Sequence, residues 1–162
     1  MIDTFIAAVE ADGGHASRVS DVAGAREHVA GLLGEDATLC FWDGDPLVRS
    51  LDPASLGTVT TPADAYTGIT GADLAVARTG TVLLTYGEGR SRATGLLPDL
   101  HVALVSAELI LPTLHEAIAR IFGGEVPRAM TMVTGASATS DIEKIRVTGA
   151  HGPRRVAIVV IG

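Results

Sequence analysis

Apolar residues recur at helical spacing in two stretches near the start of the chain. The apolar face of the first stretch consists of Ile2, Phe5, Ile6 and Val9. A second helix is predicted by the apolar positions between residues 22 and 33, with Ser20 and Asp21 before it as capping candidates. We therefore expect a helical segment over about residues 1–34.

Short apolar runs follow that are too brief for helices and rich in β-branched residues. They cover residues 37–42, 81–86, 102–105, 129–133 and 156–161. Because nearly continuous hydrophobicity is typical of strands that are covered on both faces, we expect these strands to run parallel.

The clearest helix lies between the third and fourth of these runs. Its apolar face consists of Leu114, Ile118 and Ile121. Pro112 stands at its first turn and Gly123 and Gly124 close it. Strands that alternate with helices predict an α/β sandwich. A chain of 162 residues suffices for one buried core but not for two ordinary domains, so we expect one domain over residues 1–162.

Composition and charge restrict the partners that the chain can have. Its formal net charge of −7 repels polyanions, which argues against binding to nucleic acid. The single cysteine, Cys40, lies in an apolar run and allows neither an internal disulfide nor a cluster of thiolate ligands. The first residues lack the basic stretch of a secretory leader, and no apolar run approaches the ~20 residues of a membrane span. We expect a soluble, cytoplasmic protein.

Several common site motifs are missing. The segment Gly87-Glu88-Gly89 begins like a dinucleotide-binding loop, but Arg92 occupies the position of the third glycine. No phosphate-binding P-loop sequence occurs, and Ser137 does not lie in the Gly-x-Ser-x-Gly motif of α/β-hydrolases. The histidines are far apart in the sequence and lack a second ligand at metal-binding spacing. These patterns disfavour NAD, nucleotide, hydrolase and local metal sites.

The polar loop after the run at 129–133 is the strongest candidate for a site. Its members with ligand-binding chemistry are Gly135, Ser137, Thr139 and Ser140. If the strands are parallel, this loop lies at their carboxyl edge, where hydroxyls and N–H groups can hold an anion, with Asp141 and Glu143 just behind. Alternatively, Thr139 or Ser140 simply caps a helical turn that begins at Asp141.

A second polar turn, His151-Gly152-Pro153, leads into the last predicted strand. A histidine in such a turn is a candidate proton carrier near neutral pH. Gly152 and Pro153 are equally explained by the geometry of the turn. His101, at the start of a buried strand, is better explained as a structural histidine.

Three arginines, Arg78, Arg90 and Arg92, flank the Thr79-Gly80-Thr81 turn and the loop at 87–89. A planar guanidinium suits a carboxylate or a phosphate, so together they can form an anion clamp. Solvated surface arginines are the alternative interpretation.

Five blocks of the sequence together resemble a known family. They cover residues 69–73, 78–81, 97–102, 134–143 and 151–153. Their order and spacing are similar to those of the LUD domain, the lactate utilisation protein C family. The resemblance extends from about Gly68 to the C-terminus, more than half of the chain.

This resemblance implies a three-layer, Rossmann-like α/β sandwich with a mainly parallel sheet, like that of ribose-phosphate isomerases, CoA transferases and formyltetrahydrofolate cycloligase. It also implies a component of a bacterial system that oxidises L-lactate to pyruvate. In that system the iron–sulfur clusters belong to partner proteins, and no cofactor is expected on this chain. The chain departs from the family pattern at Arg78, where an acidic residue is usual, and at Ala136 and Ala138, which replace Pro and Arg. The loss of that arginine removes a positive anion clamp.

Two functions of different class follow. The first is a lactate utilisation protein C-like component that acts with iron–sulfur partner proteins. The second is an enzyme or binding protein for an anionic small molecule that carries CoA or phosphate. The expected ligand-binding residues are Thr79, Gly80, Thr81, Gly135, Ser137, Thr139, Ser140 and Gly152. The expected catalytic residues are Glu143 or Asp141 as base or nucleophile and His151 as proton carrier.

Overall fold

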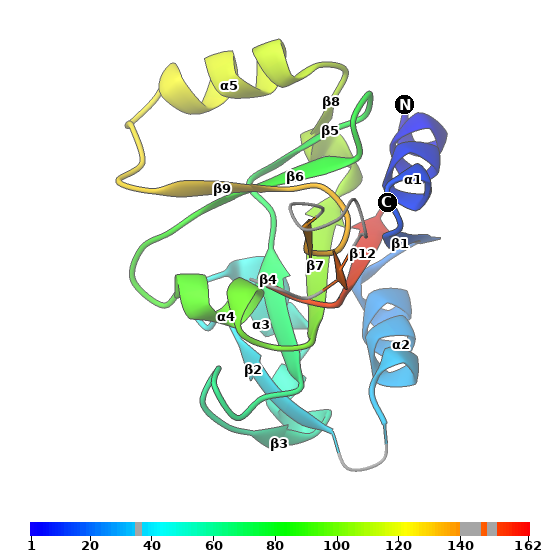
Figure 1. Cartoon of the computed structure of the whole chain (residues 1–162), viewed down its shortest axis with the longest axis vertical. Helices are drawn as coiled ribbons and strands as arrows, with labels where there is room; N and C mark the ends of the chain where they lie inside the picture. Colours follow the sequence, from blue (N-terminus) through cyan, green and yellow to red (C-terminus); the bar gives the residue numbers. More distant parts are fainter. Residues whose placement is uncertain (35–36, 140–146, 149–151) are drawn as a thin grey trace.

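The largest element of the fold is a parallel sheet of six strands (Figure 1). The computed structural model describes residues 1–34, 37–139, 147–148 and 152–162. In spatial order the strands are β1 (His15–Val19), β12 (Arg155–Ile161), β7 (Leu100–Ser106), β4 (Thr67–Gly71), β2 (Thr38–Phe41) and β3 (Thr58–Val59). Every neighbouring pair in this sheet is parallel.

A second sheet of four strands contains both of the runs that were predicted at 81–86 and 129–133. Its spatial order is β8 (Ile110–Leu111), β5 (Leu74–Val76), β6 (Thr81–Thr85) and β9 (Met130–Val133). β6 is antiparallel to both β5 and β9, so the prediction of parallel strands is wrong for β6 and β9. Val82 and Leu84 of β6 belong to the main core, whereas Leu83 belongs to a second cluster with Ala117. The continuous hydrophobicity therefore reflects burial on two faces and not strand direction.

Five α-helices and two short 3₁₀ turns connect the described strands. They are α1 (Ile2–Ala11), α2 (Val22–Leu32), α3 (Pro46–Ser50), η1 (Pro53–Ser55), α4 (Arg92–Leu96), η2 (Ala107–Leu109) and α5 (Leu114–Phe122). The predicted helices are confirmed, and Asp21 caps α2 by accepting a hydrogen bond from Gly24 N. Thr113 caps α5, so Pro112 precedes this helix and does not lie in its first turn. None of the helices in the described part of the chain has the length and apolar character needed to cross a membrane.

α2 and α3 pack on one face of the six-stranded sheet. The ring of His28 in α2 stacks on His15 of β1, with ring centres 6.4 Å apart. Gly71 of β4 packs against the carboxylate of Asp45, the residue before α3. The register of the intervening strands places His15 and Gly71 on the same face of the sheet.

α4 covers the opposite face. A side chain at position 68 would overlap the carbonyl oxygen of Thr94 in α4, so only glycine allows this close approach. Gly68 and Gly71 are three positions apart on β4 and therefore face opposite sides. The sheet thus lies between helices on both faces, which confirms the predicted Rossmann-like three-layer sandwich. In Figure 1, α5 lies across the second sheet, away from the six parallel strands.

A short antiparallel hairpin completes the described strands. It pairs β10 (Ala138–Thr139) with β11 (Val147–Thr148). Thr139 therefore lies in a strand. The alternative in which Thr139 or Ser140 caps a helical turn that begins at Asp141 concerns residues outside the described part of the chain.

Candidate functional site

A cleft of about 320 Å³ opens beside the polar loop that follows β9. One wall consists of residues 131–137, and the other contains Gly152, Pro153 and Val156. Gly95 and Leu96 of α4 also line it. The cleft therefore brings the loop after β9 together with the turn before β12.

Two backbone contacts fix the position of this loop. The N–H of Ser137 donates a hydrogen bond to the carbonyl oxygen of Pro153, at 2.9 Å. Gly135 has a φ of 67°, and a side chain there would overlap the carbonyl oxygen of Asp12. Glycine is required at this position for both reasons.

The cleft lies at the amino ends of the parallel strands. Asp12 precedes β1, Pro153 precedes β12, and Val156 is the second residue of β12. The prediction that the loop lies at the carboxyl edge is therefore wrong. β9 does not belong to the parallel sheet, so its end does not coincide with the ends of those strands.

A chain of hydroxyl groups connects this loop to the Thr79-Gly80-Thr81 turn. The Oγ1 atoms of Thr79 and Thr81 are 2.7 Å apart, and the Oγ1 atoms of Thr81 and Thr134 are also 2.7 Å apart. Gly80 has a φ of 63° and packs against the backbone of Val9. The structure thus brings together two blocks that are more than fifty residues apart in the sequence.

The structure describes only some of the remaining predicted site residues. Gly152 lines the cleft, and a Cβ atom there would lie 3.2 Å from Ser137 Cβ. Thr139 pairs with Val147 through the backbone of the β10–β11 hairpin. The other predictions, for Ser140, Asp141, Glu143 and His151, lie outside the described residues.

Thr134 lines this cleft but was not among the predicted ligand-binding residues. It belongs to the polar stretch that was recognised, but no pattern in the sequence distinguishes it from its neighbours. Its contact with Thr81 depends on the antiparallel pairing of β6 with β9, in which Val82 lies opposite Val133. Only knowledge of that register would have identified it.

The described lining of the cleft is polar but uncharged. Thr131, Thr134 and Ser137 contribute hydroxyl groups, and Met132, Val133 and Leu96 contribute apolar surface. Hydroxyl and backbone N–H donors can hold a carboxylate or phosphate oxygen. Among the described residues, the arrangement fits the binding of a small anion.

The predicted clamp of three arginines is not formed. The guanidinium of Arg90 lies 3.0 Å from Asp73 and 3.6 Å from Asp45, and it stacks over the ring of Trp42 at 4.4 Å. Two carboxylates of the chain thus compensate its charge. Arg92 lies over the ring of Tyr86, at 5.7 Å.

Arg78 is exposed and lies at the opposite end of the β5–β6 hairpin from Arg90. β5 and β6 run antiparallel, so residues that follow each of them point to opposite ends of the hairpin. Arg78 and Arg90 therefore do not lie side by side, as a clamp on one anionic group requires.

His101 and Cys40 are buried in the sheet. His101 is fully buried, and its Nε2 lies 2.8 Å from Thr70 Oγ1. Burial lowers the pKa of His101 to about 4, because the charged form is poorly solvated there. Burial also raises the pKa of the Cys40 thiol. Both residues are consistent with the structural roles expected from the sequence.

Comparison with known proteins identifies relatives of this chain. A sequence model of the LUD domain matches residues 59–161. Lactate utilization protein C of Deinococcus radiodurans is 40% identical over 97 residues, which cover 58% of this chain and 45% of that protein. Lactate utilization protein C of a Geobacillus species is 30% identical over 132 residues, covering 78% of this chain and 52% of that protein. The chain thus spans about half the length of these relatives.

A solved structure has the same fold. The crystal structure of a DUF162 family protein from Deinococcus radiodurans, at 1.70 Å resolution, superposes with a TM-score of 0.74 at 22% identity. The match covers 99% of this chain and 96% of that chain. At this identity, the comparison supports the fold alone.

Proposed function

The chain belongs to the LUD domain family, and we propose that it is a lactate utilisation protein C-like component of a system that oxidises L-lactate to pyruvate. The observation that carries this proposal is the match of the LUD domain over residues 59–161. The names of relatives such as that of Deinococcus radiodurans support it further. Those relatives are about twice as long, so the proposal concerns the part of their activity that resides in this domain.

We assign the redox centres of this system to iron–sulfur partner proteins. Oxidation of lactate to pyruvate releases two electrons and two protons, which an acceptor must take up. An iron–sulfur cluster is usually held by four cysteine thiolates, and this chain has one cysteine, Cys40, which is buried. The donor set of this chain does not fit such a cluster, so its proposed contribution is to bind a ligand or a partner.

The cleft beside the Gly135 loop is the proposed ligand site. Ser137 and Thr134 supply hydroxyl groups, and Gly135 and Gly152 line the cleft beside them. Lactate and pyruvate are both small carboxylates, which such donors can hold. Thr139 and Ser140 are proposed to extend the same site.

Growth on lactate tests this proposal. In the organism that encodes the chain, deletion of its gene should abolish growth on L-lactate and leave growth on pyruvate intact. A plasmid copy should restore growth, whereas a copy with Ser137→Ala should not. Ser50→Ala, an exposed serine at the end of α3, is the matched control and should restore growth. Undiminished growth of the deletion strain on L-lactate would contradict the proposal.

The volume and polar lining of the cleft also favour a second candidate function. In it the chain is an enzyme or a binding protein for an anionic ligand that carries CoA or phosphate. Glu143 or Asp141 would act as base or nucleophile, and His151 as proton carrier. A free carboxylate as small as lactate would then not be the preferred ligand.

A thermal-shift screen distinguishes the two candidates. The panel contains lactate, pyruvate, sugar phosphates, CoA, nucleotides and folates. A ligand at 100 times its dissociation constant stabilises the folded protein by roughly 2.7 kcal/mol, which is readily measured. A shift with a phosphate-bearing compound that Ser137→Ala removes would support the second candidate, and a shift with lactate or pyruvate alone would support the first.

A further inference from the structure

The chain of threonine hydroxyls beside the cleft leads from the lining of the cleft to the surface of the protein. Thr134 lines the cleft, Thr81 is buried at 6% exposure, and Thr79 is exposed. The Oγ1 atom of Thr81 lies 2.7 Å from that of each neighbour, an ordinary hydrogen-bond distance between two hydroxyl groups. The buried hydroxyl therefore connects an end in the cleft with an end in the solvent.

The directions of the two hydrogen bonds are linked through the single proton of Thr81. A hydroxyl group donates one hydrogen bond, so Thr81 donates to one neighbour and accepts from the other. In one direction, Thr79 donates to Thr81, Thr81 donates to Thr134, and Thr134 keeps its own proton for a group in the cleft. In the reverse direction, Thr134 donates to Thr81, and its oxygen accepts a hydrogen bond from a group in the cleft.

These two directions match the two states of a 2-hydroxy acid that is oxidised to a 2-oxo acid. The alcohol of lactate donates a hydrogen bond, whereas the ketone oxygen of pyruvate accepts one. The alcohol fits the direction in which Thr134 accepts, and the ketone fits the direction in which Thr134 donates. The same side chains can therefore bind both the substrate and the product of the proposed oxidation.

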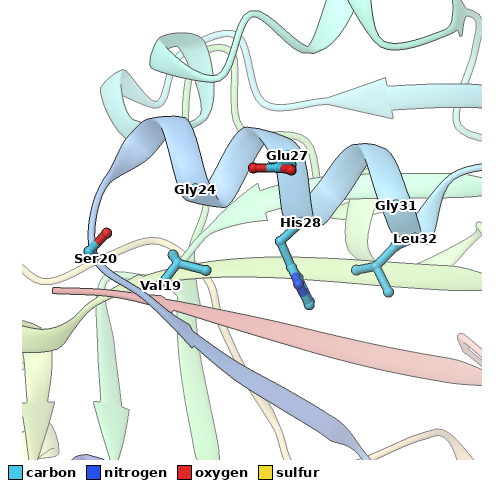
Figure 2. Close-up of a pocket in the computed structure, with 7 residues that line it drawn as sticks. All are labelled: Val19, Ser20, Gly24, Glu27, His28, Gly31 and Leu32. Carbon is cyan, nitrogen blue, oxygen red and sulfur yellow. The ribbon is translucent and has the colours of Figure 1, made fainter.

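Imidazoles, the usual proton carriers near neutral pH, do not belong to the described lining of the cleft. His28 lies in a groove between α2 and β1, where Figure 2 shows its ring directed toward the strands. This ring stacks on that of His15. His101 is fully buried in the six-stranded sheet. For a proton that leaves a ligand in the cleft, the described residues thus offer the hydroxyl chain rather than an imidazole.

We propose that Thr134, Thr81 and Thr79 form a proton relay, which carries the alcohol proton of a bound 2-hydroxy acid from the cleft to the solvent. The proposal rests on the proposed function, because it requires an alcohol that is oxidised in the cleft. It extends that function by naming the path of one of the two protons that the oxidation releases.

The relay step is balanced in atoms and electrons. The C–H hydrogen of the alcohol carbon leaves with two electrons to an acceptor on the iron–sulfur partner protein. The hydroxyl oxygen thereby becomes that of a protonated ketone, a strong acid, which gives its proton to Thr134. Thr134 passes its own proton to Thr81, Thr81 passes its proton to Thr79, and Thr79 passes its proton to water. A C=O double bond has then formed, and the chain has the direction that binds the ketone.

Oxidation of L-lactate by permeabilised cells tests this relay. The gene is deleted in the organism that encodes the chain, and variants are supplied on a plasmid. The rate of pyruvate formation from L-lactate is measured and divided by the amount of soluble chain on an immunoblot. Thr81→Val replaces the hydroxyl by a methyl group and should lower this rate at least about tenfold, as the loss of a proton-transfer group does. Thr81→Ser retains the hydroxyl and should restore most of the rate.

Thr79→Val interrupts the relay at its exposed end, where the substitution should leave the protein folded. Its rate should fall as that of Thr81→Val does. In both variants the ratio of the rates in H₂O and D₂O should exceed that of the unmodified chain, because proton transfer then limits the reaction. A loss of folded protein lowers the rate without changing this ratio, so the isotope effect distinguishes a relay from a structural role.

Thr58→Val is the matched control, because it makes the same change at an exposed position on β3, an edge strand of the six-stranded sheet. This variant should oxidise L-lactate at the unmodified rate. A full rate with Thr81→Val or Thr79→Val, or a lower rate with an unchanged isotope effect, would overturn the relay and leave the proposed function intact. A deletion strain that still oxidises L-lactate at the full rate would contradict both.

Discussion

The hydroxyl of Thr81 lies 2.7 Å from the hydroxyl of Thr134, and this contact joins the start of β6 to the loop after β9. Thr79 extends the chain by a second contact of 2.7 Å. Hydrogen bonds in such a chain polarise one another, so the three groups act together. The contact fixes the loop that carries Gly135 relative to the Thr79-Gly80-Thr81 turn.

Replacing the central hydroxyl should destabilise the protein measurably. Thr81→Val keeps the shape of a side chain that is only 6% exposed, but it leaves both neighbouring hydroxyls without this partner. We expect a loss of about 1–2 kcal/mol in the free energy of unfolding. Urea denaturation followed by the fluorescence of Trp42, the only tryptophan, measures it. Thr58→Val, at an exposed position on β3, is the control, and an equal loss there would contradict the interpretation.

Arg90 should contribute more to stability than a surface arginine does. Its guanidinium bonds to Asp73 at 3.0 Å and stacks on Trp42, and the side chain is only 20% exposed. Arg90→Met leaves the carboxylates of Asp45 and Asp73 uncompensated, so we expect a loss of about 2–3 kcal/mol, somewhat less than for a fully buried pair.

Arg90→Lys, measured in the same unfolding experiment, distinguishes the contribution of the positive charge from that of the planar guanidinium. Lysine retains the charge but lacks the planar fork and the stacking surface. We therefore expect a stability between those of the unmodified protein and Arg90→Met. A lysine variant as stable as the unmodified protein would show that only the charge at position 90 matters.

Much of the fold was accessible from the sequence because burial leaves a pattern of apolar residues. β2, β7 and β12 are continuous apolar runs, and α5 has both an apolar face and the capping residue Thr113. β1 was not predicted, because its residues show no such apolar pattern. This strand forms the sheet edge, and in the sequence His15–Val19 only Ala16 is buried, so no apolar run marks it.

The position of the candidate site could not be predicted, because it depends on contacts between segments that are far apart in the sequence. Gly135 and Ser137 were identified from their residue types, but their place at the amino ends of β1 and β12 follows from the separate sheet that contains β9. Similarly, Arg90 was predicted as part of an anion clamp. Its partners Asp45 and Asp73 follow other strands, and only the packed sheet brings them to the guanidinium.

The buried imidazole of His101 should make stability depend on pH in the acid range. Burial lowers its pKa from 6.5 to about 4 in the folded state. Above pH 6.5 the imidazole is neutral in both states, whereas between pH 6.5 and 4 only the unfolded chain binds the proton. Stability therefore falls as the pH falls through this window, by about 3 kcal/mol in all, and the effect levels off below it.

Urea denaturation at a series of pH values measures this dependence. His101→Gln removes the titrating group. The change in its free energy of unfolding per pH unit between pH 6.5 and 4 should therefore be smaller, by the amount that one bound proton contributes. If this variant does not fold, an NMR titration of the imidazole in the unmodified protein provides the same information. A His101 ring that takes up its proton near pH 6.5 in the folded protein would contradict the prediction.

The turn before β12 should be energetically coupled to the loop after β9. A Cβ atom at position 152 would lie 3.2 Å from Ser137 Cβ and 3.4 Å from its hydroxyl, closer than most such contacts. Gly152→Ala should therefore destabilise the protein by about 1 kcal/mol, as small overpacking does. Ser137→Gly removes the atoms that it would meet, so the double variant should regain most of that loss, with a coupling of about 1 kcal/mol.

Unfolding free energies of the four proteins in this cycle give the coupling directly. Gly87→Ala combined with Ser137→Gly is the matched control, because position 87 has open space and no contact with the loop. Its effects should add to within about 0.5 kcal/mol. If the effects of Gly152→Ala and Ser137→Gly on the free energy of unfolding also add, the turn before β12 does not contact the loop after β9 in solution. The turn then does not line the cleft. Measured coupling would instead mean that the turn before β12 and the Gly135 loop form one site, as binding of a ligand between them requires.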